Sequence, residues 1–550
     1  MRYIFGFGIV FVVYFTKSVL SAPVADDNLI ITLPNGKIQG AAYKTLNHNK
    51  TYYGFRGIPY GKPPLGDLRL ESPQPAESWN GILNATVDSK SCITINYLSE
   101  PNQESEDCLY INVYIPTLQP SEKLPVMFWI YGGAFLAGSS DKNLYGPDFL
   151  MEKDVIMVSF NYRLGALGFV STGDRVLPGN LGLKDQNLAL RWTRDNIENF
   201  GGDPEKVTIF GQSAGGASTG LHLVSKKSSG LFRAAIVESG CALNPWAIDS
   251  NPKKTAYLFA DRIPNGNYGN DTQALKDFLK IQTVEDIVIA NTKLEVLFGP
   301  TLEIDSEDAF ITDSPFVLLE NGDFNQVPIV IGVTSEESLS FLGDESQTFN
   351  VGLTYDLNPT SLIPLDLFSN TSSITTVTHR IKEIYLNRNE LFAMNLAAVA
   401  EVYTDNFFRR SSLKHAELAS SFVPVYFYEF SYYGRTSTIP FIDGVEKATH
   451  SAEIPFLFNH LGMSGTTNTN DLLTQDRTVT FWTNFAKYLN PTPTKSELFT
   501  DILWPKLHRK TLLYLNINNT LQIRGHLKRS SYSNWNDIFE TYGRKPYVTY

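Results

Sequence analysis

The sequence has few cysteines, and its glycine and proline contents are ordinary. The three cysteines are scattered and give no zinc-ligand spacing. The 39 glycines and 29 prolines are a background share, which excludes collagen-like and low-complexity chains. Aromatic residues, in contrast, make up 13% of the 550 residues and argue against intrinsic disorder.

Positive charge is also scarce. Lysine and arginine number 46 against 57 acidic residues, which gives a formal net charge of −11, and no basic run is longer than two residues. A nucleic-acid-binding protein needs a basic surface to neutralise phosphates. We therefore expect no nucleic-acid partner.

The first residues have the pattern of a secretory signal. Arg2 supplies a positive charge, and residues 3–15 form an apolar and aromatic stretch. This stretch is shorter than the ~20 residues that span a bilayer, which favours a cleaved signal over a membrane anchor. We predict cleavage after Ser21, with 22–550 as one mature domain because no long polar linker divides it. Residues 542–550 carry no apolar tail, so we expect no GPI anchor.

Five N-glycosylation sequons support export of the chain, although each triplet alone is a weak signal. Their asparagines are Asn49, Asn84, Asn270, Asn370 and Asn518. In an oxidising compartment Cys92 and Cys108, which lie close in sequence, could close a short loop. Cys241 is left over, and we interpret it as a small buried apolar residue rather than a reactive thiol.

Apolar runs and helical stretches alternate along the chain. The runs are nearly continuous in β-branched and aromatic residues, which is typical of strands covered on both faces. They lie at residues 126–130, 155–160, 207–210, 234–237, 329–333 and 425–430. A helical stretch at 188–197 follows a glycine-rich segment. This alternation predicts an α/β fold with a mostly parallel sheet. The stretch from 253 to 324 mixes amphipathic helices with loops and could form a cap over a site.

The most informative segment is residues 207–216, which reads as a strand, then Gly-x-Ser-x-Gly, then a small-residue helix start. A serine at such a sharp turn has strained backbone angles and projects its hydroxyl outward, and flanking glycines remove Cβ atoms that would clash. The helix that follows points its positive end toward the reacting oxygen. Ser213 is therefore the candidate nucleophile; the alternative is an ordinary turn.

An acyl-transfer nucleophile needs donors for the negative oxygen of its tetrahedral intermediate. Residues 130–135 contain consecutive small residues after a buried strand, so their N–H groups can approach a substrate closely. The candidate donors are the N–H groups of Gly133, Ala134 and Ala214. A plain turn at the strand end is the alternative interpretation.

In these segments and in those given below, the sequence resembles the type-B carboxylesterase and cholinesterase family, and insect secreted carboxylesterases within it. The match covers nearly all of the mature chain and implies an α/β-hydrolase fold and a disulfide between Cys92 and Cys108. The matching segments are residues 55–60, 63–69, 106–114, 161–163, 179–186 and 200–204.

The resemblance also implies a Ser…Glu…His triad in that chain order. Alignment places the acid at Glu337, beside a second carboxylate at Glu336, and the base at His450. Ser338 stands where the family has glycine, and Lys447 stands where a glycine is usual before the histidine. The other seven histidines lack such a context. Ser239 matches a family serine beside the triad, and we assign it a supporting role, with a buried hydrogen-bonded serine as the alternative.

These residues predict hydrolysis of esters through an acyl-enzyme on Ser213, with His450 as the base and Glu337 fixing its tautomer. Such chemistry needs no metal and no organic cofactor. The loop from Cys92 to Cys108 has no tryptophan, and Gln212 stands where cholinesterases have glutamate, so the attraction for a cationic choline ester is reduced. We therefore expect neutral small-molecule esters, such as odorant, pheromone or xenobiotic esters, as substrates.

Three alternatives remain open. Gly-Gln-Ser-Ala-Gly resembles the nucleophile motif of insect juvenile hormone esterases and also that of other insect esterases. A non-catalytic cholinesterase-like adhesion protein is a distant alternative, because all three triad positions are filled. A lipase would need a mobile amphipathic lid, and the loop from Cys92 to Cys108 is polar. Trp246 is a candidate for the acyl side of the pocket or a core residue, and the sequence predicts no oligomeric state.

Overall fold

The computed structural model describes most of the chain. The described residues are 24–97, 99, 102–293, 298–364, 367, 373–434, 442, 444–445, 448–460 and 468–550. The signal segment 1–21 and Asn370 lie outside the described residues, as does Lys447.

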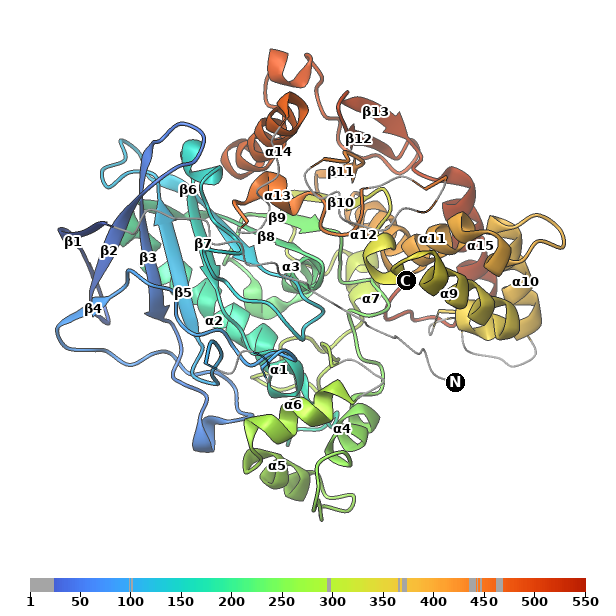
Figure 1. The fold of residues 1–550 in the computed structure, drawn as a ribbon, viewed down its shortest axis with the longest axis horizontal. Helices are drawn as coiled ribbons and strands as arrows, with labels where there is room; N and C mark the ends of the chain where they lie inside the picture. The colour runs from blue at the N-terminus through green and yellow to red at the C-terminus, as the bar shows by residue number, and fades with distance from the viewer. Residues whose placement is uncertain are drawn as a thin grey trace.

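A single large sheet organises the described part of the chain (Figure 1). Its thirteen strands run in the order β1-β2-β3-β5-β7-β6-β8-β9-β10-β11-β12-β13, and β4 pairs with β2. The strands are β1 (Val24–Leu33), β2 (Gly36–Lys44), β3 (Thr51–Pro59), β4 (Ile82–Asn84), β5 (Tyr110–Ile115), β6 (Leu124–Ile130), β7 (Ile156–Phe160), β8 (Gly202–Gln212), β9 (Ala234–Glu238), β10 (Ile329–Thr334), β11 (Val425–Phe430), β12 (Leu513–Ile517) and β13 (Gln522–Gly525).

The strands expected from apolar runs form the parallel centre of this sheet. Neighbouring strands from β7 through β6, β8, β9, β10 and β11 to β12 are parallel, whereas β1, β2, β3 and β5 extend the β7 edge in antiparallel pairs. Every residue of β7, β9, β10 and β11 is buried. The continuous apolar character of these runs therefore reflects a sheet covered on both faces, and the predicted α/β-hydrolase architecture agrees with the fold.

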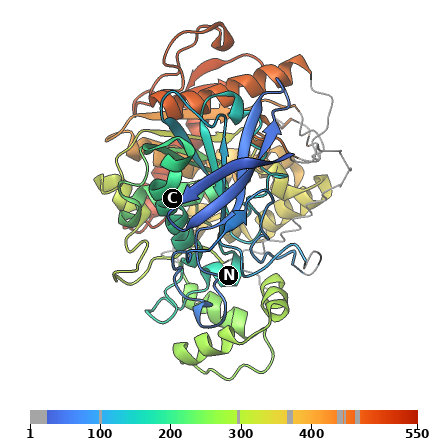
Figure 2. The ribbon, with the colours of Figure 1, turned by 90° about the vertical axis from the view of Figure 1, so that its left-hand side faces the viewer.

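Helices cover both faces of the sheet. In Figures 1 and 2 the long helix α14 lies on one side of the strands, while α2 and α3 lie on the other. The helices are α1 (Gly165–Phe169), α2 (Leu181–Asn196), α3 (Ala214–Val224), α4 (Pro252–Ala260), α5 (Thr272–Lys280), α6 (Val284–Thr292), α7 (Pro315–Asn321), α8 (Leu339–Leu342), α9 (Glu345–Leu357), α10 (Ile374–Tyr385), α11 (Leu396–Thr404), α12 (Arg410–Ala419), α13 (Ile454–Leu457), α14 (Thr469–Tyr488) and α15 (Arg529–Tyr542).

Two helical predictions are refined by the structure. The helix expected at 188–197 begins earlier, at Leu181, directly after Asn180 in a left-handed conformation, and it ends at Asn196. The stretch from 253 to 324 does contain helices, α4 to α7, and α4, α5 and α6 form a lobe at the bottom of Figure 1. Its role as a cap over a site stays a prediction.

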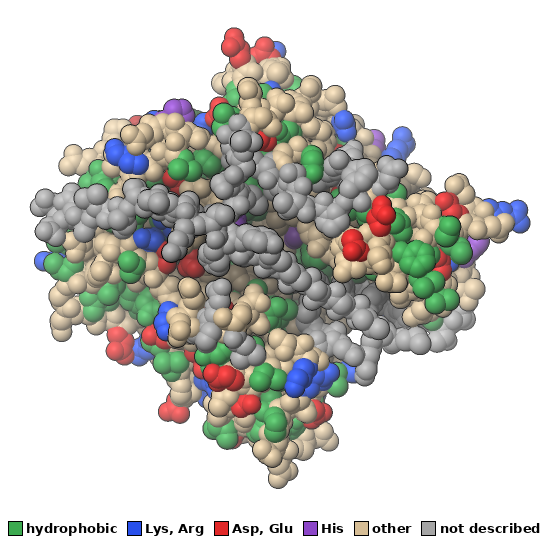
Figure 3. All heavy atoms as spheres, viewed as in Figure 1, with side chains coloured by type: hydrophobic (Ala, Val, Ile, Leu, Met, Phe, Trp, Pro, Cys, Tyr) green, Lys and Arg blue, Asp and Glu red, His purple; other side chains and the backbone are tan. Residues whose placement is uncertain are grey.

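The surface is charged but mixed in sign. On the face shown in Figure 3, the described acidic and basic side chains are interspersed and form no extended basic area. None of the described helices is both long and apolar enough to cross a bilayer. The described residues also contain no group of three or more His, Cys, Asp or Glu side chains placed to hold a metal ion.

Candidate active site

Ser213 lies at the turn between β8 and α3, in the centre of the parallel sheet. Its φ of 59° and ψ of −124° are rare for a side-chain-bearing residue. Its N–H donates a 2.9 Å hydrogen bond to the carbonyl oxygen of Glu238 at the end of β9. The turn is thus tied to the neighbouring strand, and the partly exposed hydroxyl precedes the N-terminus of an eleven-residue helix.

Glycines make this turn sterically possible. A Cβ on Gly215 would lie 1.9 Å from the carbonyl oxygen of Ile130, and a Cβ on Gly240 would lie 2.1 Å from the carbonyl oxygen of Ser213. Real Cβ atoms do not approach backbone atoms so closely, so any side chain here would displace the turn. The Gly-x-Ser-x-Gly spacing is therefore a packing requirement of this site.

The candidate oxyanion donors lie beside the candidate nucleophile. A Cβ on Gly132, just after β6, would lie 2.9 Å from the Cβ of Ser213, so the glycine turn touches the serine. Gly133 and Ala134 both have positive φ, 116° and 56°. Among the described residues, no acceptor takes a hydrogen bond from the N–H of Gly133 or Ala134. The N–H of Ala214 is in the first turn of α3, where helical N–H groups have no partner within the helix.

Glu337, and not Glu336, carries the carboxylate that meets His450. Its Oε2 lies 2.6 Å from Nδ1 of His450, and its Oε1 accepts a 2.8 Å hydrogen bond from the N–H of Thr334. The Glu337 side chain is fully buried, just after β10. Ser338 has an αR backbone, φ −65°, so this position does not need the glycine that the family uses. Its N–H donates to Oγ1 of Thr404 at 3.2 Å.

His450 is held at both ring nitrogens. Because Nδ1 faces a carboxylate, it carries the proton, and Nε2 presents its lone pair. The side-chain nitrogen of Gln212 lies 3.2 Å from Nε2. The hydrogen bonds of the described residues include none between Nε2 and the hydroxyl of Ser213, although Gln212 and Ser213 are adjacent. In unliganded sites, catalytic hydrogen bonds are often long and tighten only when substrate binds.

Aromatic rings surround the imidazole on its other side. The ring centroids of Phe341 and Phe408 lie 5.2 and 4.8 Å from that of His450. Phe408 belongs to a π-helical turn, Asp405–Arg409, between α11 and α12. Trp246 packs against Phe408 at 5.8 Å and donates its indole N–H to the carbonyl oxygen of Phe407. The candidate acyl-pocket residue therefore belongs to the same aromatic cluster as the histidine.

The remaining predicted residues take defined places. Ser239 is fully buried with φ 47°, and its hydroxyl donates to Oε1 of Glu453 at 3.4 Å. Cys92 and Cys108 form a disulfide. Cys241 is a buried free thiol whose pKa burial raises to about 12, so it is not poised to react.

Four of the five predicted glycosylation asparagines are described. Asn49, Asn84 and Asn270 are exposed, whereas Asn518 is half-buried. The side-chain nitrogen of Asn518, to which a glycan would attach, donates a 3.0 Å hydrogen bond to Oγ of Ser431. Of these four sites, Asn518 is the least accessible.

Sequence reasoning missed several contacts in the site. It used Gln212 only as a mark of substrate charge and did not place it on His450. It gave no role to Phe341 or Phe408, because segments far apart in sequence bring their rings to the histidine. It gave no role to Glu238 or Glu453. Three buried carboxyls, Glu238, Glu337 and Glu453, in fact lie behind the site.

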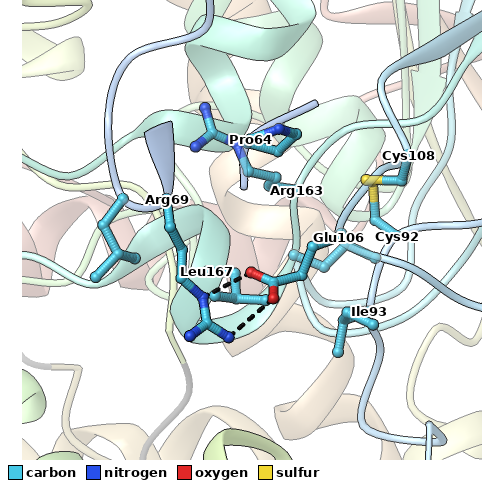
Figure 4. Close-up of a pocket in the computed structure, with 10 residues that line it drawn as sticks. Pro64, Arg69, Cys92, Ile93, Glu106, Cys108, Arg163 and Leu167 are labelled. Atoms are coloured by element: carbon cyan, nitrogen blue, oxygen red, sulfur yellow. Dashed lines mark hydrogen bonds and ion pairs between the residues drawn. A yellow bond between two sulfur atoms is a disulfide. The ribbon is translucent and has the colours of Figure 1, made fainter. Parts of the chain in front are cut away.

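A small cavity of about 10 Å³ lies away from these residues, beside the disulfide (Figure 4). Figure 4 shows Arg69 and Glu106 joined by two hydrogen bonds at its wall, with Nε and Oε2 2.7 Å apart. None of Ser213, Glu337 and His450 lines this cavity. Because ion-paired and apolar groups make its wall, it has the character of a packing defect rather than of a reaction site.

The chain is similar in sequence and structure to known proteins. A family model described as the carboxylesterase family matches residues 27–535. A juvenile hormone esterase of Tribolium castaneum is 35% identical, over 88% of this chain and 87% of that protein. A carboxylic ester hydrolase of Bombus ignitus is 34% identical, over 92% of this chain and 93% of that protein. The crystal structure of juvenile hormone esterase from Manduca sexta, with OTFP covalently attached, superposes with a TM-score of 0.82 at 29% identity, over 93% of this chain and 99% of that one.

Proposed function

The chain belongs to the carboxylesterase family and is a carboxylic ester hydrolase, and from this premise we propose that it is a secreted serine esterase of neutral esters. The observation that carries the proposal is the 2.6 Å contact between Glu337 and Nδ1 of His450. It keeps the proton on Nδ1, so that Nε2 is unprotonated and can act as a base once the hydroxyl of Ser213 replaces the amide of Gln212 at that nitrogen.

In the proposed reaction, Nε2 of His450 takes the proton of the Ser213 hydroxyl as the oxygen attacks the ester carbonyl. Glu337 holds the imidazole tautomer and stabilises the imidazolium that forms. His450 then protonates the leaving alcohol, and an acyl-enzyme remains on Ser213. Water repeats the sequence and releases the acid.

The developing negative oxygen is assigned to the N–H groups of Gly133, Ala134 and Ala214. Two of them lie in a loop with positive φ and have no described acceptor, and the third opens α3. Such preorganised donors stabilise the tetrahedral intermediate by about 3 kcal/mol each. Ser239 is assigned a supporting role, because its backbone N–H joins β9 to β10 through the carbonyl oxygen of Gly332.

A neutral ester is favoured by the surroundings of the base. Gln212, an uncharged side chain, occupies the position next to Nε2, and Phe341 and Phe408 pack beside the ring. No described tryptophan lies in the loop from Cys92 to Cys108 to bind a quaternary ammonium. The site therefore has the chemistry of an apolar acyl or alcohol pocket.

Juvenile hormone is the second candidate substrate. It is favoured by two relatives that bear the name juvenile hormone esterase, one of them the solved structure with a TM-score of 0.82. The Gly-Gln-Ser-Ala-Gly motif agrees with this candidate and with other insect esterases alike.

A hydrolysis panel tests these proposals. Purified wild type and Ser213→Ala are assayed with p-nitrophenyl acyl esters, juvenile hormone, volatile acetates and acetylthiocholine. Ser213→Ala is expected to lower kcat by about 10⁴-fold or more. Equal measurable rates in the two proteins would refute Ser213 as the nucleophile, and no hydrolysis of any ester by wild type would favour the adhesion alternative. A preference for acetylthiocholine would refute the neutral-ester assignment.

Secretion is proposed from the signal pattern, together with the disulfide and the exposed sequons Asn49, Asn84 and Asn270. Expression of the full chain in insect cells is expected to release protein that begins at Ala22 and loses mass on deglycosylation. Recovery only in the cell pellet, with Met1 retained, would contradict this.

A further inference from the structure

Behind the candidate triad lie two buried carboxyls that the reaction does not use. Glu238 ends β9, and Glu453 lies just before α13, three residues after His450. Both side chains are fully buried, as is that of Glu337. Three carboxyl groups are therefore gathered in one water-excluded region of the protein.

Each of the two carboxyls has one partnered oxygen and one without a partner. The indole N–H of Trp482 on α14 donates to Oε1 of Glu238 at 2.9 Å, and the hydroxyl of Ser239 donates to Oε1 of Glu453 at 3.4 Å. In the part of the chain that the structure describes, neither Oε2 has a hydrogen-bond partner, and neither carboxyl forms an ion pair. A buried carboxylate without a partner cation carries a desolvation penalty of several kcal/mol, which protonation removes.

The groups that face this pair come from several elements. They are Glu337 after β10, Tyr428 on β11, Trp482 on α14 and Ser239 after β9, and none of them is a cation. Burial and the charge of Glu337 raise the pKa of Glu453 to about 8. Burial and the charge of Glu453 raise the pKa of Glu238 well above its ordinary value.

The pair also connects the two halves of the reaction centre. The carbonyl oxygen of Glu238 accepts the N–H of Ser213, so this residue supports the nucleophile turn. Glu453 lies at the end of the turn that carries His450, where Ala452 donates its N–H to the carbonyl oxygen of Thr449. Ser239, the residue after Glu238, bonds to Glu453 and so links the two segments.

We propose that Glu238 and Glu453 are positioning residues that both carry a proton at neutral pH, so that Glu337 is the only one of these three fully buried carboxyls that is ionised. Three carboxylates behind one imidazole would strongly favour the imidazolium, and a protonated ring cannot accept the proton of Ser213. The neutral carboxyl of Glu453 still accepts the hydroxyl of Ser239 and so joins the segments of Ser213 and His450 without adding charge, while the neutral carboxyl of Glu238 accepts the indole N–H of Trp482. This role rests on the proposed function of the triad.

The first test measures stability and does not depend on activity. Glu453→Gln copies the neutral form of the side chain. In wild type, the folded protein keeps a proton on Glu453, whereas the unfolded chain releases that proton above the ordinary pKa of a carboxyl group. Because the pKa is higher in the folded state, wild type loses stability as the pH rises. The denaturation midpoint of Glu453→Gln, measured relative to that of wild type, should therefore increase from about pH 5 to about pH 8. A difference that stays constant with pH would overturn the proposal.

The second test is the pH dependence of kcat/KM on a p-nitrophenyl ester. If Glu453 is neutral where the base titrates, the acidic limbs of Glu453→Gln and wild type should coincide, with rates at neutral pH within about threefold. A limb displaced to lower pH in Glu453→Gln would show that Glu453 is ionised and would refute the proposal. Glu453→Ala, which removes the bond to Ser239, should lower kcat by about tenfold or more with little change in KM.

A variant of the second carboxyl and one control variant separate the outcomes. Glu238→Gln should reproduce the stability drift of Glu453→Gln, and difference infrared spectra should lose a protonated-carboxyl band in each variant. Glu429→Gln removes a buried carboxyl on β11 that accepts a bond from Asn516, away from the pair, and should leave the rate unchanged. If wild type fails to hydrolyse any ester, the proposed function fails, while the stability and infrared results still decide the protonation of the pair.

Discussion

The proposed nucleophile and the proposed base of this esterase are held in different ways. Ser213 lies on a turn fixed by backbone packing, because backbone carbonyl oxygens occupy the positions where Gly215 and Gly240 would carry a Cβ atom. His450 is fixed by side chains: Glu337 and Gln212 at its nitrogens, and two phenylalanine rings beside it. The region around Ser213 cannot accept an added side chain at these glycines without a backbone shift. The region around His450 consists of side-chain contacts that can be substituted one at a time.

This difference separates two kinds of mutational effect. A change at the nucleophile turn must move the backbone, so it should affect stability and activity together. A change around the histidine should leave the fold intact and alter the protonation or orientation of the ring. Each prediction below compares these two behaviours.

The largest effect is expected at the acid on the base side. Glu337→Gln should lower kcat by about 10⁴-fold with little loss of stability, because an amide favours the wrong imidazole tautomer while filling the same volume. Glu336→Gln is the matched control and should change kcat by less than about threefold. Steady-state kinetics and thermal unfolding of both variants check this, and the reverse ranking would move the acid to Glu336.

The next effect tests the rigidity of the nucleophile side. Gly240→Ala would place a Cβ 2.1 Å from the carbonyl oxygen of Ser213, so the turn must shift. We expect a loss of about 1–3 kcal/mol in unfolding free energy and about 100-fold in kcat/KM. Gly299→Ala is the control, because its Cβ would have no neighbour closer than 3.6 Å. Equal behaviour of the two alanine variants would contradict the packing argument.

The two regions also differ in how far the sequence predicts them. The nucleophile turn follows from local rules, since a strand, two glycines and a helix start must adjoin in the chain for Ser213 to be presented. The parallel strands were predictable for a similar reason, because continuous apolar runs such as that of β11 indicate burial on both faces. The disulfide between Cys92 and Cys108 agreed with a family resemblance.

The base side depends on contacts that no local pattern encodes. Gln212 is 238 residues from His450 in sequence, and Phe408 comes from a π-helical turn. The start of α2 at Leu181 was missed because Asn180 adopts a left-handed conformation that propensity does not predict. The family resemblance placed the acid at Glu337, with Glu336 beside it, and the backbone after β10 brings the carboxylate of Glu337 to the histidine.

A decrease in pH should lower the stability of the folded protein through His222, which lies on α3 in the region around Ser213. This histidine is fully buried between Oγ of Ser228, at 2.7 Å, and Oε1 of Gln186, at 3.1 Å, and burial lowers its pKa to about 3. The unfolded chain takes up a proton below its ordinary pKa of about 6.5, while the folded protein does not. Stability therefore falls as pH decreases through this window, by about 2 kcal/mol between pH 7 and pH 5 for this one group.

Chemical denaturation at several pH values checks this expectation. His222→Gln should flatten the decline between pH 7 and pH 5, whereas His379→Gln, on the exposed face of α10, should not. If both variants follow the wild-type curve, the acid sensitivity of the nucleophile side lies elsewhere.

The smallest effect is a shift in pH dependence caused by Gln212, a side chain that joins the two regions. It belongs to β8 beside Ser213, yet its amide lies 3.2 Å from Nε2 of His450. Gln212→Glu puts a negative charge against that nitrogen and favours the imidazolium, so the acidic limb of kcat/KM should move up by about one pH unit. Gln212→Ala adds no charge and should leave the limb in place while changing kcat only several-fold. Both variants should unfold like wild type, because among the described residues the amide of Gln212 bonds to the ring of His450 and to no backbone group. If Gln212→Glu instead destabilised the fold as Gly240→Ala does, Gln212 would belong to the rigid region around Ser213. The boundary between the two regions would then lie between the side chain of Gln212 and the imidazole of His450.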